Sequence, residues 1–135
     1  MGDRGQVRII GTNGADSPDL YFYTHWYATD LESIVANALN FGTGRFSDSE
    51  YLNRIIFSQM IKDDILSETG YGIGFEPHGD VWKLVVVNHL DKTAGIMETV
   101  HKVDGSAGFT FEHQNFDWVQ EPVPYKNFVL NNQSV

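Results

Sequence analysis

The side chains best suited to recognition or acid–base chemistry follow one short aromatic run, residues 20–27 (LYFYTHWY). Alternation along a β-strand puts four of them on one side of that run: Tyr21, Tyr23, His25 and Tyr27. Each ring carries a polar atom, so the row combines contact area with hydrogen bonding, as suits a ligand-binding or protein-binding surface. We expect the row on the outer face of a sheet whose other face carries helices. The alternative is that aromatic residues near the C-terminus cover it.

Histidine is the residue type most often used for acid–base chemistry and metal binding near neutral pH. We single out His25 as a candidate general base with Asp63 or Asp64 in support. The alternatives are a partly buried strand histidine and a solvated helix end. The other histidines are dispersed, with no His-x-x-x-His or His-x-His pair: His78, His89, His101 and His113. A metal site would need residues from distant segments, so we predict neither a metal nor a cofactor.

Two further features could serve anionic ligands. Arg45 and Arg54 could each hold an anion, although pairing with one of the eighteen carboxylates is the alternative. Three alternating glycines occur in the segment 68–74 (ETGYGIG), but they match neither a Walker loop nor a dinucleotide fingerprint. They lead into a strand, so the anion-binding geometry of a helix N-terminus is missing. A glycine face in a strand instead predicts a close neighbour against the backbone.

Charge and cysteine content exclude several functional classes. Eighteen Asp and Glu against nine Lys and Arg give a net charge of −9, and the basic residues are scattered. Direct binding of DNA or RNA is therefore not expected. The acidity fits either simple solubility or attraction to a basic partner surface. The absence of cysteine excludes disulfides and thiolate chemistry. No apolar run approaches the ~20 residues of a membrane span, and we expect a cytoplasmic protein.

The hydrophobic pattern predicts a single α+β domain over residues 1–135. Capping boxes that begin at Thr29 and Ser47 precede two amphipathic helices. Strands are expected at 6–10, 20–27, 70–75, 81–89, 94–101 and 109–112, with a turn at 102–108 and irregular chain over 122–135. The order ββααβββ favours an antiparallel or mixed sheet of about five to six strands with both helices on one face. The dense apolar run 81–89 is typical of a central strand buried on both sides.

Several segments resemble a family of small uncharacterised proteins from bacteriophages, prophages and some bacteria. They are MGDRG (1–5), LY (20–21), YTHW (23–26), YLNRIIF (51–57), MIKDD (60–64) and ETGYGI (68–73). The likeness covers roughly residues 1–90, and Tyr27 and Ala28 stand where the family has a glycine pair. The family has no assigned activity or catalytic residues. The resemblance implies a small accessory phage protein that engages a host macromolecule.

These observations leave three functional hypotheses. The first is a non-enzymatic acidic binding protein, encoded by a phage, that inhibits a basic host protein complex handling nucleic acid, such as a defence system. The second is a binder or sponge for a small molecule or nucleotide signal, which would use Tyr21, Tyr23 and His25. Arg45 or Arg54 would then supply a positive charge. The third is a small enzyme with His25 as general base.

Overall fold

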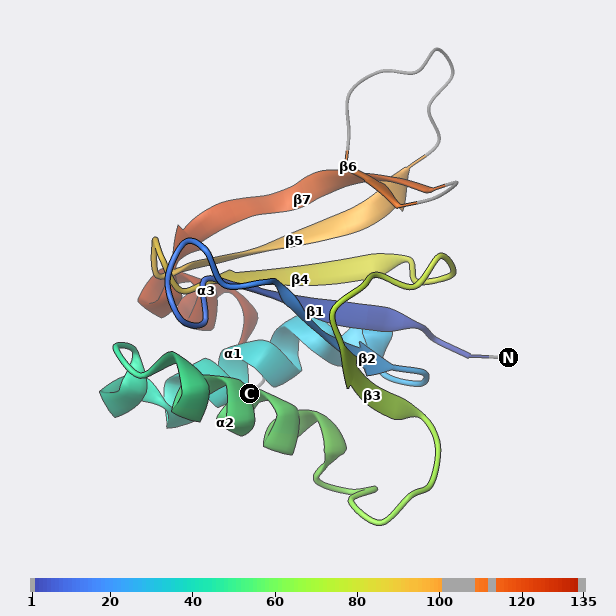
Figure 1. Cartoon of the computed structure of the whole chain (residues 1–135), viewed down its shortest axis with the longest axis horizontal. Helices are drawn as coiled ribbons and strands as arrows, with labels where there is room; N and C mark the ends of the chain where they lie inside the picture. Colours follow the sequence, from blue (N-terminus) through green and yellow to red (C-terminus); the bar gives the residue numbers. More distant parts are fainter. Residues whose placement is uncertain (1, 101–108, 112–113, 134–135) are drawn as a thin grey trace.

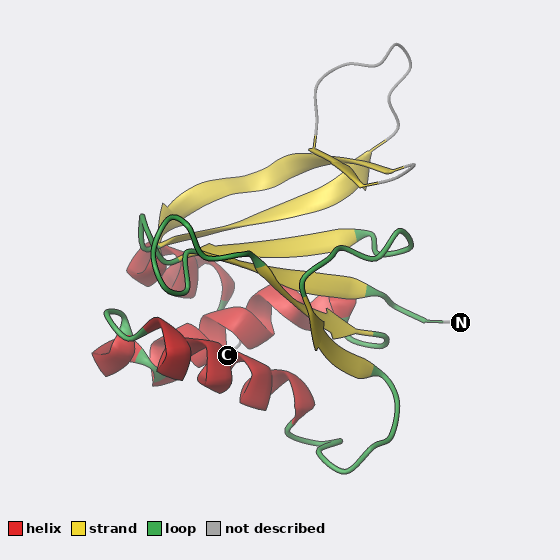
Figure 2. Cartoon of the chain, in the orientation of Figure 1, coloured by secondary structure: helices red, strands yellow, loops and turns green. Residues whose placement is uncertain are grey.

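A computed structural model describes residues 2–100, 109–111 and 114–133; the expected turn at 102–108, with His101 and His113, lies outside these residues. The described residues form one mixed sheet with helices on one face (Figure 1 and Figure 2). The strands are β1 (Gly5–Ile10), β2 (Leu20–Thr24), β3 (Tyr71–Gly74), β4 (Lys83–Asn88), β5 (Thr93–Val100), β6 (Phe109–Phe111) and β7 (Gln114–Pro124). Their order across the sheet is β3-β2-β1-β4-β5-β7-β6.

The α-helices are α1 (Leu31–Phe41), α2 (Ser49–Ile61) and α3 (Tyr125–Asn132). Short 3₁₀ turns at Ala28–Asp30 and Thr43–Arg45 precede α1 and α2. Within the described part of the chain, no helix is both long and apolar enough to cross a bilayer.

The strand β1 is an interior strand, third in the order across the sheet. It pairs antiparallel with β2 and parallel with β4, and the other strand pairs described are antiparallel. The α+β class and the mixed sheet with helices on one face are thus confirmed. The described part of the sheet has seven strands rather than five or six, because residues 109–111 and 114–124 pair as separate strands.

The chain is regular as far as Asn132, which corrects the expectation of irregular structure over 122–135 for the residues that the structure describes. The strand β7 runs to Pro124, and α3 follows at once. Tyr125 and Phe128 are buried in the core on the helix face, whereas Leu130 is 82% exposed. A helix of 8 residues is too short to be stable by propensity alone, so its stability comes from tertiary packing. The local sequence pattern therefore does not predict it.

Two apolar layers lie on the two faces of the sheet. The layer on the helix face includes Val85 of β4, Leu39 of α1 and Ile56 of α2. The layer on the outer face includes Leu84 of β4 and Phe116 of β7. Because β4 contributes alternate residues to both layers, the expectation of a central strand buried on both sides is confirmed.

Both predicted capping boxes are wrong, because carboxylates supply the acceptors expected from hydroxyl groups. The N-cap side chain of α1 makes no capping hydrogen bond. The backbone N–H of Thr29 donates instead to Oδ2 of Asp3, 2.8 Å away, at the other end of the β1–β2 segment. In α2 the N-cap is Asp48 rather than Ser47, and its side chain accepts from the N–H of Tyr51. A charged acceptor forms the stronger hydrogen bond to a backbone N–H.

A partly buried ion pair attaches α1 to the sheet. Lys83 of β4 is 3% exposed, and its Nζ lies 2.6 Å from Oε1 of Glu32 in the first turn of α1. The same Nζ donates to the carbonyl of Thr29 at 3.4 Å and lies 4.8 Å from the centroid of the Trp82 ring. These contacts replace the hydration that the ammonium group loses on burial.

Removing either partner of this ion pair should have unequal effects. Glu32→Ala leaves the buried ammonium group without its counter-charge, so we expect a loss of about 3–5 kcal/mol in the free energy of unfolding. Lys83→Met leaves only the more exposed Glu32 carboxylate, which water can solvate, and should cost less than half as much. Urea unfolding of both variants measures the difference. Equal losses, or the reverse order, would contradict this account.

Candidate functional site

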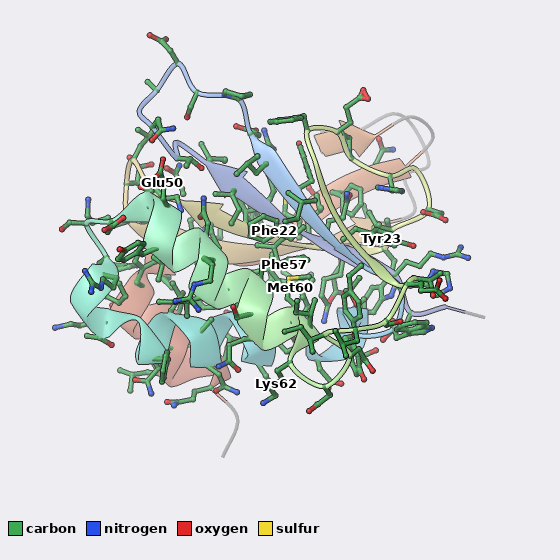
Figure 3. All side chains as sticks on the ribbon, turned by 60° about the horizontal axis from the view of Figure 1, so that its bottom comes forward. Phe22, Tyr23, Glu50, Phe57, Met60 and Lys62 are labelled. Atoms are coloured by element: carbon green, nitrogen blue, oxygen red, sulfur yellow. The ribbon has the colours of Figure 1, made fainter. Side chains whose placement is uncertain are left out.

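The strand β2 divides its side chains between the two faces as its alternation predicts. Tyr21 is 5% exposed and belongs to the apolar layer on the outer face, against which Tyr23 packs. Phe22 points the other way and meets Phe57 of α2 edge to face, with the ring centroids 5.3 Å apart (Figure 3). The aromatic row therefore begins on the face opposite the helices.

The row breaks after Thr24, which corrects the predicted strand 20–27. The Oγ1 of Thr24 accepts from the backbone N–H groups of Trp26 and Tyr27, at 3.4 and 3.3 Å. Such a side-chain acceptor offers the backbone an alternative to the strand ladder, and the chain turns. Tyr27 consequently leaves the row and stacks on Tyr71 of β3, with the centroids 6.4 Å apart and the planes 17° from parallel.

Tyr23 and His25 form a polar cluster with Arg4 and Asp80. The Tyr23 hydroxyl lies 3.1 Å from Nδ1 of His25, and Nε of Arg4 donates to the same Nδ1 at 3.3 Å. Nη1 of Arg4 also lies 2.9 Å from Oδ2 of Asp80 in an ion pair. Burial, together with the negative charge of Asp80, raises the pKa of Tyr23. The positive charge of this cluster is therefore already paired within the chain.

The segment between β3 and β4 covers this part of the outer face. The ring of His78 stacks on Tyr23, with the centroids 4.4 Å apart. The buried side chain of Gln6 binds the same segment twice: Nε2 donates to the carbonyl of Glu76 at 3.4 Å, and Oε1 accepts from the N–H of His78 at 3.0 Å. Residues 76–78 thus lie over Tyr23, and Phe116 of β7 belongs to the same apolar layer.

Arg45 and Arg54 make their contacts around α2, on the helix side of the sheet. The guanidinium group of Arg45 lies 4.8 Å from the centroid of the Tyr51 ring. Nη1 of Arg54 donates to Oγ of Ser58 at 3.3 Å. Because Tyr23 lies on the opposite face, the structure does not bring these guanidinium groups together with the aromatic row.

The carboxylates predicted to support His25 have other contacts. Asp63 and Asp64 line a cavity of about 190 Å³ near the end of α2, together with Tyr27. Asp64 accepts from the hydroxyl of Tyr71 at 2.7 Å, and burial together with this contact raises the pKa of Tyr71. The side-chain hydrogen bonds of His25 belong instead to the cluster described above. In the part of the chain that the structure describes, no group of three or more His, Asp or Glu residues could hold a metal ion.

The strand β3 forms one margin of the sheet (Figure 1). Large apolar side chains in and beside it are exposed. Ile73 is 59% exposed, and Phe75, one residue beyond the strand, is 66% exposed. Trp26, 42% exposed, lies against Gly70, whose positive φ of 96° and contact with the indole ring leave no room for a side chain. We call residues 70–75 together with Trp26 the β3 edge.

The expectation of a close neighbour against the glycine face is confirmed at Gly70, which contacts Trp26, and is wrong at Gly72 and Gly74. A Cβ atom added at either position would meet nothing within 4 Å. Across the ladder the two glycines pair with Tyr23 and Tyr21, so they lie on the outer face. Because β3 ends the described sheet, its backbone is bare on this face and unpaired on its far side.

The chain around the β3 edge is acidic. Residues 62–76 contain a single basic residue, Lys62, and four carboxylates: Asp63, Asp64, Glu68 and Glu76. The same segment exposes two more apolar side chains, Ile65 at 69% and Leu66 at 92%. Alternating glycines and flanking acids were visible in the sequence, but their position at a sheet margin was not.

His89, one of the dispersed histidines, forms a buried network that no sequence spacing indicated. Its Nε2 lies 2.7 Å from Oδ1 of Asn53 in α2, and its Nδ1 lies 3.0 Å from the hydroxyl of Tyr125 in α3. Because Nδ2 of Asn53 donates to Thr12 at 3.1 Å, Oδ1 is the acceptor, which assigns the imidazole proton to Nε2. Burial, with the nearby charge of Lys92, lowers the pKa of His89 to about 4. His89 is therefore a neutral residue that joins elements of the fold.

This network makes stability depend on pH. Between the ordinary histidine pKa of about 6.5 and the value of about 4, the unfolded chain binds a proton at His89 that the folded protein does not. The free energy of unfolding should therefore fall by up to about 3 kcal/mol as the pH drops through this window. Urea unfolding from pH 7 to pH 4 measures it. In His89→Gln this part of the decline should disappear, and parallel profiles of variant and wild type would contradict the assignment.

Comparisons with known proteins do not assign the chain to a class. Neither a family model, nor a curated protein, nor a solved structure matches it. The structure offers two candidate binding surfaces, the partly covered aromatic row and the open β3 edge.

Proposed function

We propose that this protein is a non-enzymatic binding protein that holds a basic partner protein against the β3 edge. The observation that carries this proposal is a sheet margin with exposed apolar side chains and bare glycines in an acidic surround. Proteins usually protect sheet margins with lysine, proline, a bulge or a covering segment. The strand β3, with the sequence YGIG, contains neither lysine nor proline and pairs with β2 in regular register.

The charge around the β3 edge defines the kind of partner. Carboxylates before and after the strand, in a chain of net charge −9, give this margin a negative potential. Complementary charge accelerates association with a basic surface and disfavours acidic partners. Ile73 and Phe75 add apolar area that a partner can bury. An exposed apolar patch with a charged rim is the arrangement expected of a protein-binding surface.

The resemblance to small phage and bacterial proteins supports the identity of the partner. We infer a phage-encoded accessory protein that acts in the host cytoplasm and inhibits a host protein complex handling nucleic acid. Proteins of that kind hold nucleic acid on clustered positive surfaces. An acidic protein is attracted to such a surface and can occupy it without catalysing any reaction.

The aromatic row supports small-molecule binding less well than the β3 edge supports protein binding. Tyr21 is 5% exposed, and the ring of Tyr23 is stacked against His78. The guanidinium group of Arg4 is engaged by His25 and Asp80. That of Arg8, which pairs with Tyr21 across the ladder, is engaged by Asp19. A ligand at the row would have to displace contacts within the chain, whereas the apolar side chains of the β3 edge are already exposed to solvent.

Neutralising carboxylates beside the β3 edge should weaken partner binding. For the double variant Glu68→Gln/Glu76→Gln we expect about 3- to 10-fold less partner recovered from host lysate, because the charge that attracts a basic surface is reduced. Affinity purification followed by quantitative mass spectrometry measures the recovery. Binding to the wild-type protein should also fall between about 50 mM and about 500 mM salt, since salt screens exposed charges.

The control variant Asp16→Asn/Glu121→Gln removes two carboxylates from exposed positions outside residues 62–76. It should recover nearly as much partner as the wild-type protein does. Equal losses in the two double variants would move the binding surface away from the β3 edge. Failure of the wild-type protein to recover any partner at low salt would contradict the proposed function itself.

A further inference from the structure

We propose that the partner adds a β-strand of its own to the open side of β3, with large side chains lying over Gly72 and Gly74. This inference rests on the proposed function and specifies its binding mode. The occupant is an extended segment of another protein. It carries aromatic side chains on one face, aliphatic side chains on the other, and Lys or Arg near its ends.

The backbone of β3 has hydrogen-bonding groups directed away from the sheet. The N–H of His25 donates to the carbonyl of Gly70 at 2.8 Å, so these two residues form a hydrogen-bonded pair. Hydrogen-bonded and non-hydrogen-bonded pairs alternate along an antiparallel ladder. Gly72 therefore bonds toward β2, whereas the N–H and C=O groups of Tyr71 and Ile73 point away from it. These outward groups are the template with which an added strand pairs.

The bare glycines define what lies on the outer face of the added strand. Neighbouring strands lie about 4.8 Å apart, so the added strand would lie about 10 Å from β2. A Cβ atom on Gly72 or Gly74 would meet nothing within 4 Å. An aromatic ring from the added strand can therefore lie over Gly72 or Gly74 on the outer face, beside β2. Aromatic cross-strand neighbours stabilise glycine-containing margins in this way.

The other face and the two ends define the remaining specificity. Ile73 pairs with Phe22 across the ladder, so it points toward the helix side and offers an aliphatic contact to the added strand. Glu68 precedes β3, and Glu76 follows it. A short strand of 4 residues provides few backbone hydrogen bonds, so lysine or arginine near the ends must add charge attraction.

The same charge argues against a second copy of this chain as the occupant. Pairing of two β3 strands would bring the carboxylates of both copies into the same margin, with Lys62 as the single basic residue of each 62–76 segment. Like charges placed opposite each other destabilise strand pairing. Sedimentation of the free protein should accordingly show a monomer. A dimer that Ile73→Pro dissociates would overturn the assignment to a foreign partner.

The probe is a random library of nine-residue peptides selected against the immobilised full chain. Selected peptides should alternate aromatic with aliphatic residues and carry Lys or Arg near their ends. On binding of such a synthetic peptide, hydrogen exchange at the amides of Tyr71 and Ile73 should slow at least tenfold. A library that yields no binder, or binders that leave both amides unprotected, would overturn the proposal.

The first variant pair isolates the outward N–H of Ile73. Proline and alanine both remove most of the side chain, but only proline also removes the N–H. Because that N–H points away from β2, Ile73→Pro should keep the β2–β3 ladder, as proline does at solvent-facing positions of edge strands. We expect the peptide Kd of Ile73→Pro to be at least about tenfold weaker than that of Ile73→Ala. Equal Kd values would overturn strand addition.

The second variant pair tests the glycine face and does not depend on proline. Gly72→Val places a side chain in open space, so the melting temperature should stay the same or rise. The added side chain occupies the space meant for the partner's ring, and peptide binding should weaken at least about tenfold. Gly44→Val, at another glycine with open space around its Cβ position, should leave binding unchanged. Unchanged binding in Gly72→Val would overturn the placement of the partner's side chains.

The two sets of experiments separate this inference from the proposed function. If Ile73→Pro and Gly72→Val still recover the lysate partner while Glu68→Gln/Glu76→Gln does not, the protein binds a basic partner by another mode. The inference then fails and the proposed function stands. If no lysate partner is recovered by any form, the proposed function fails irrespective of the peptide results.

Discussion

The pairing of β1 on both of its sides is the constraint on which the rest of this structure depends. β1 joins β2 antiparallel and β4 parallel, so neither side of β1 is available to any other strand. The next strand in the chain, β3, pairs with the other side of β2 and forms the margin of the sheet. Gly5, the first residue of β1, lacks a side chain and so lets Ala28 pack closely against it. A Cβ atom at Gly5 would lie 2.9 Å from the Cβ atom of Ala28.

The same pairing decides which surface is covered and which stays open. To reach β4 from β3, the chain must pass β2 and β1, and the hydrogen bonds of Gln6 hold the connecting segment against the outer face. His78 then stacks on Tyr23, so this part of the aromatic row already makes contacts within the molecule. In the part of the chain that the structure describes, no strand pairs with the far side of β3. The topology thus moves the candidate binding surface from the row to the β3 edge.

The sequence correctly predicted the features that depend on short-range periodicity. Alternation in residues 20–24 assigned Phe22 and Tyr23 to opposite faces, and the apolar run of β4 indicated burial on both sides. The failures involve contacts between distant segments. The carboxylate of Asp3 accepts a hydrogen bond from the backbone N–H of Thr29. The Tyr125 hydroxyl lies within hydrogen-bonding distance of His89, which is 36 residues earlier in the chain. The glycines of β3 suggested close packing because their pattern does not reveal whether the strand is central or marginal.

The acidity of the chain helps to account for an unpaired margin at β3. An unpaired margin without lysine or proline would ordinarily promote self-association. Carboxylates on both sides of β3 oppose pairing between two copies through like-charge repulsion, and they do so without covering the backbone or filling the glycine face. The same carboxylates attract a basic segment. A single set of charges can therefore exclude the chain's own copies and select a partner, which lysine protection of the margin could not do for a basic target.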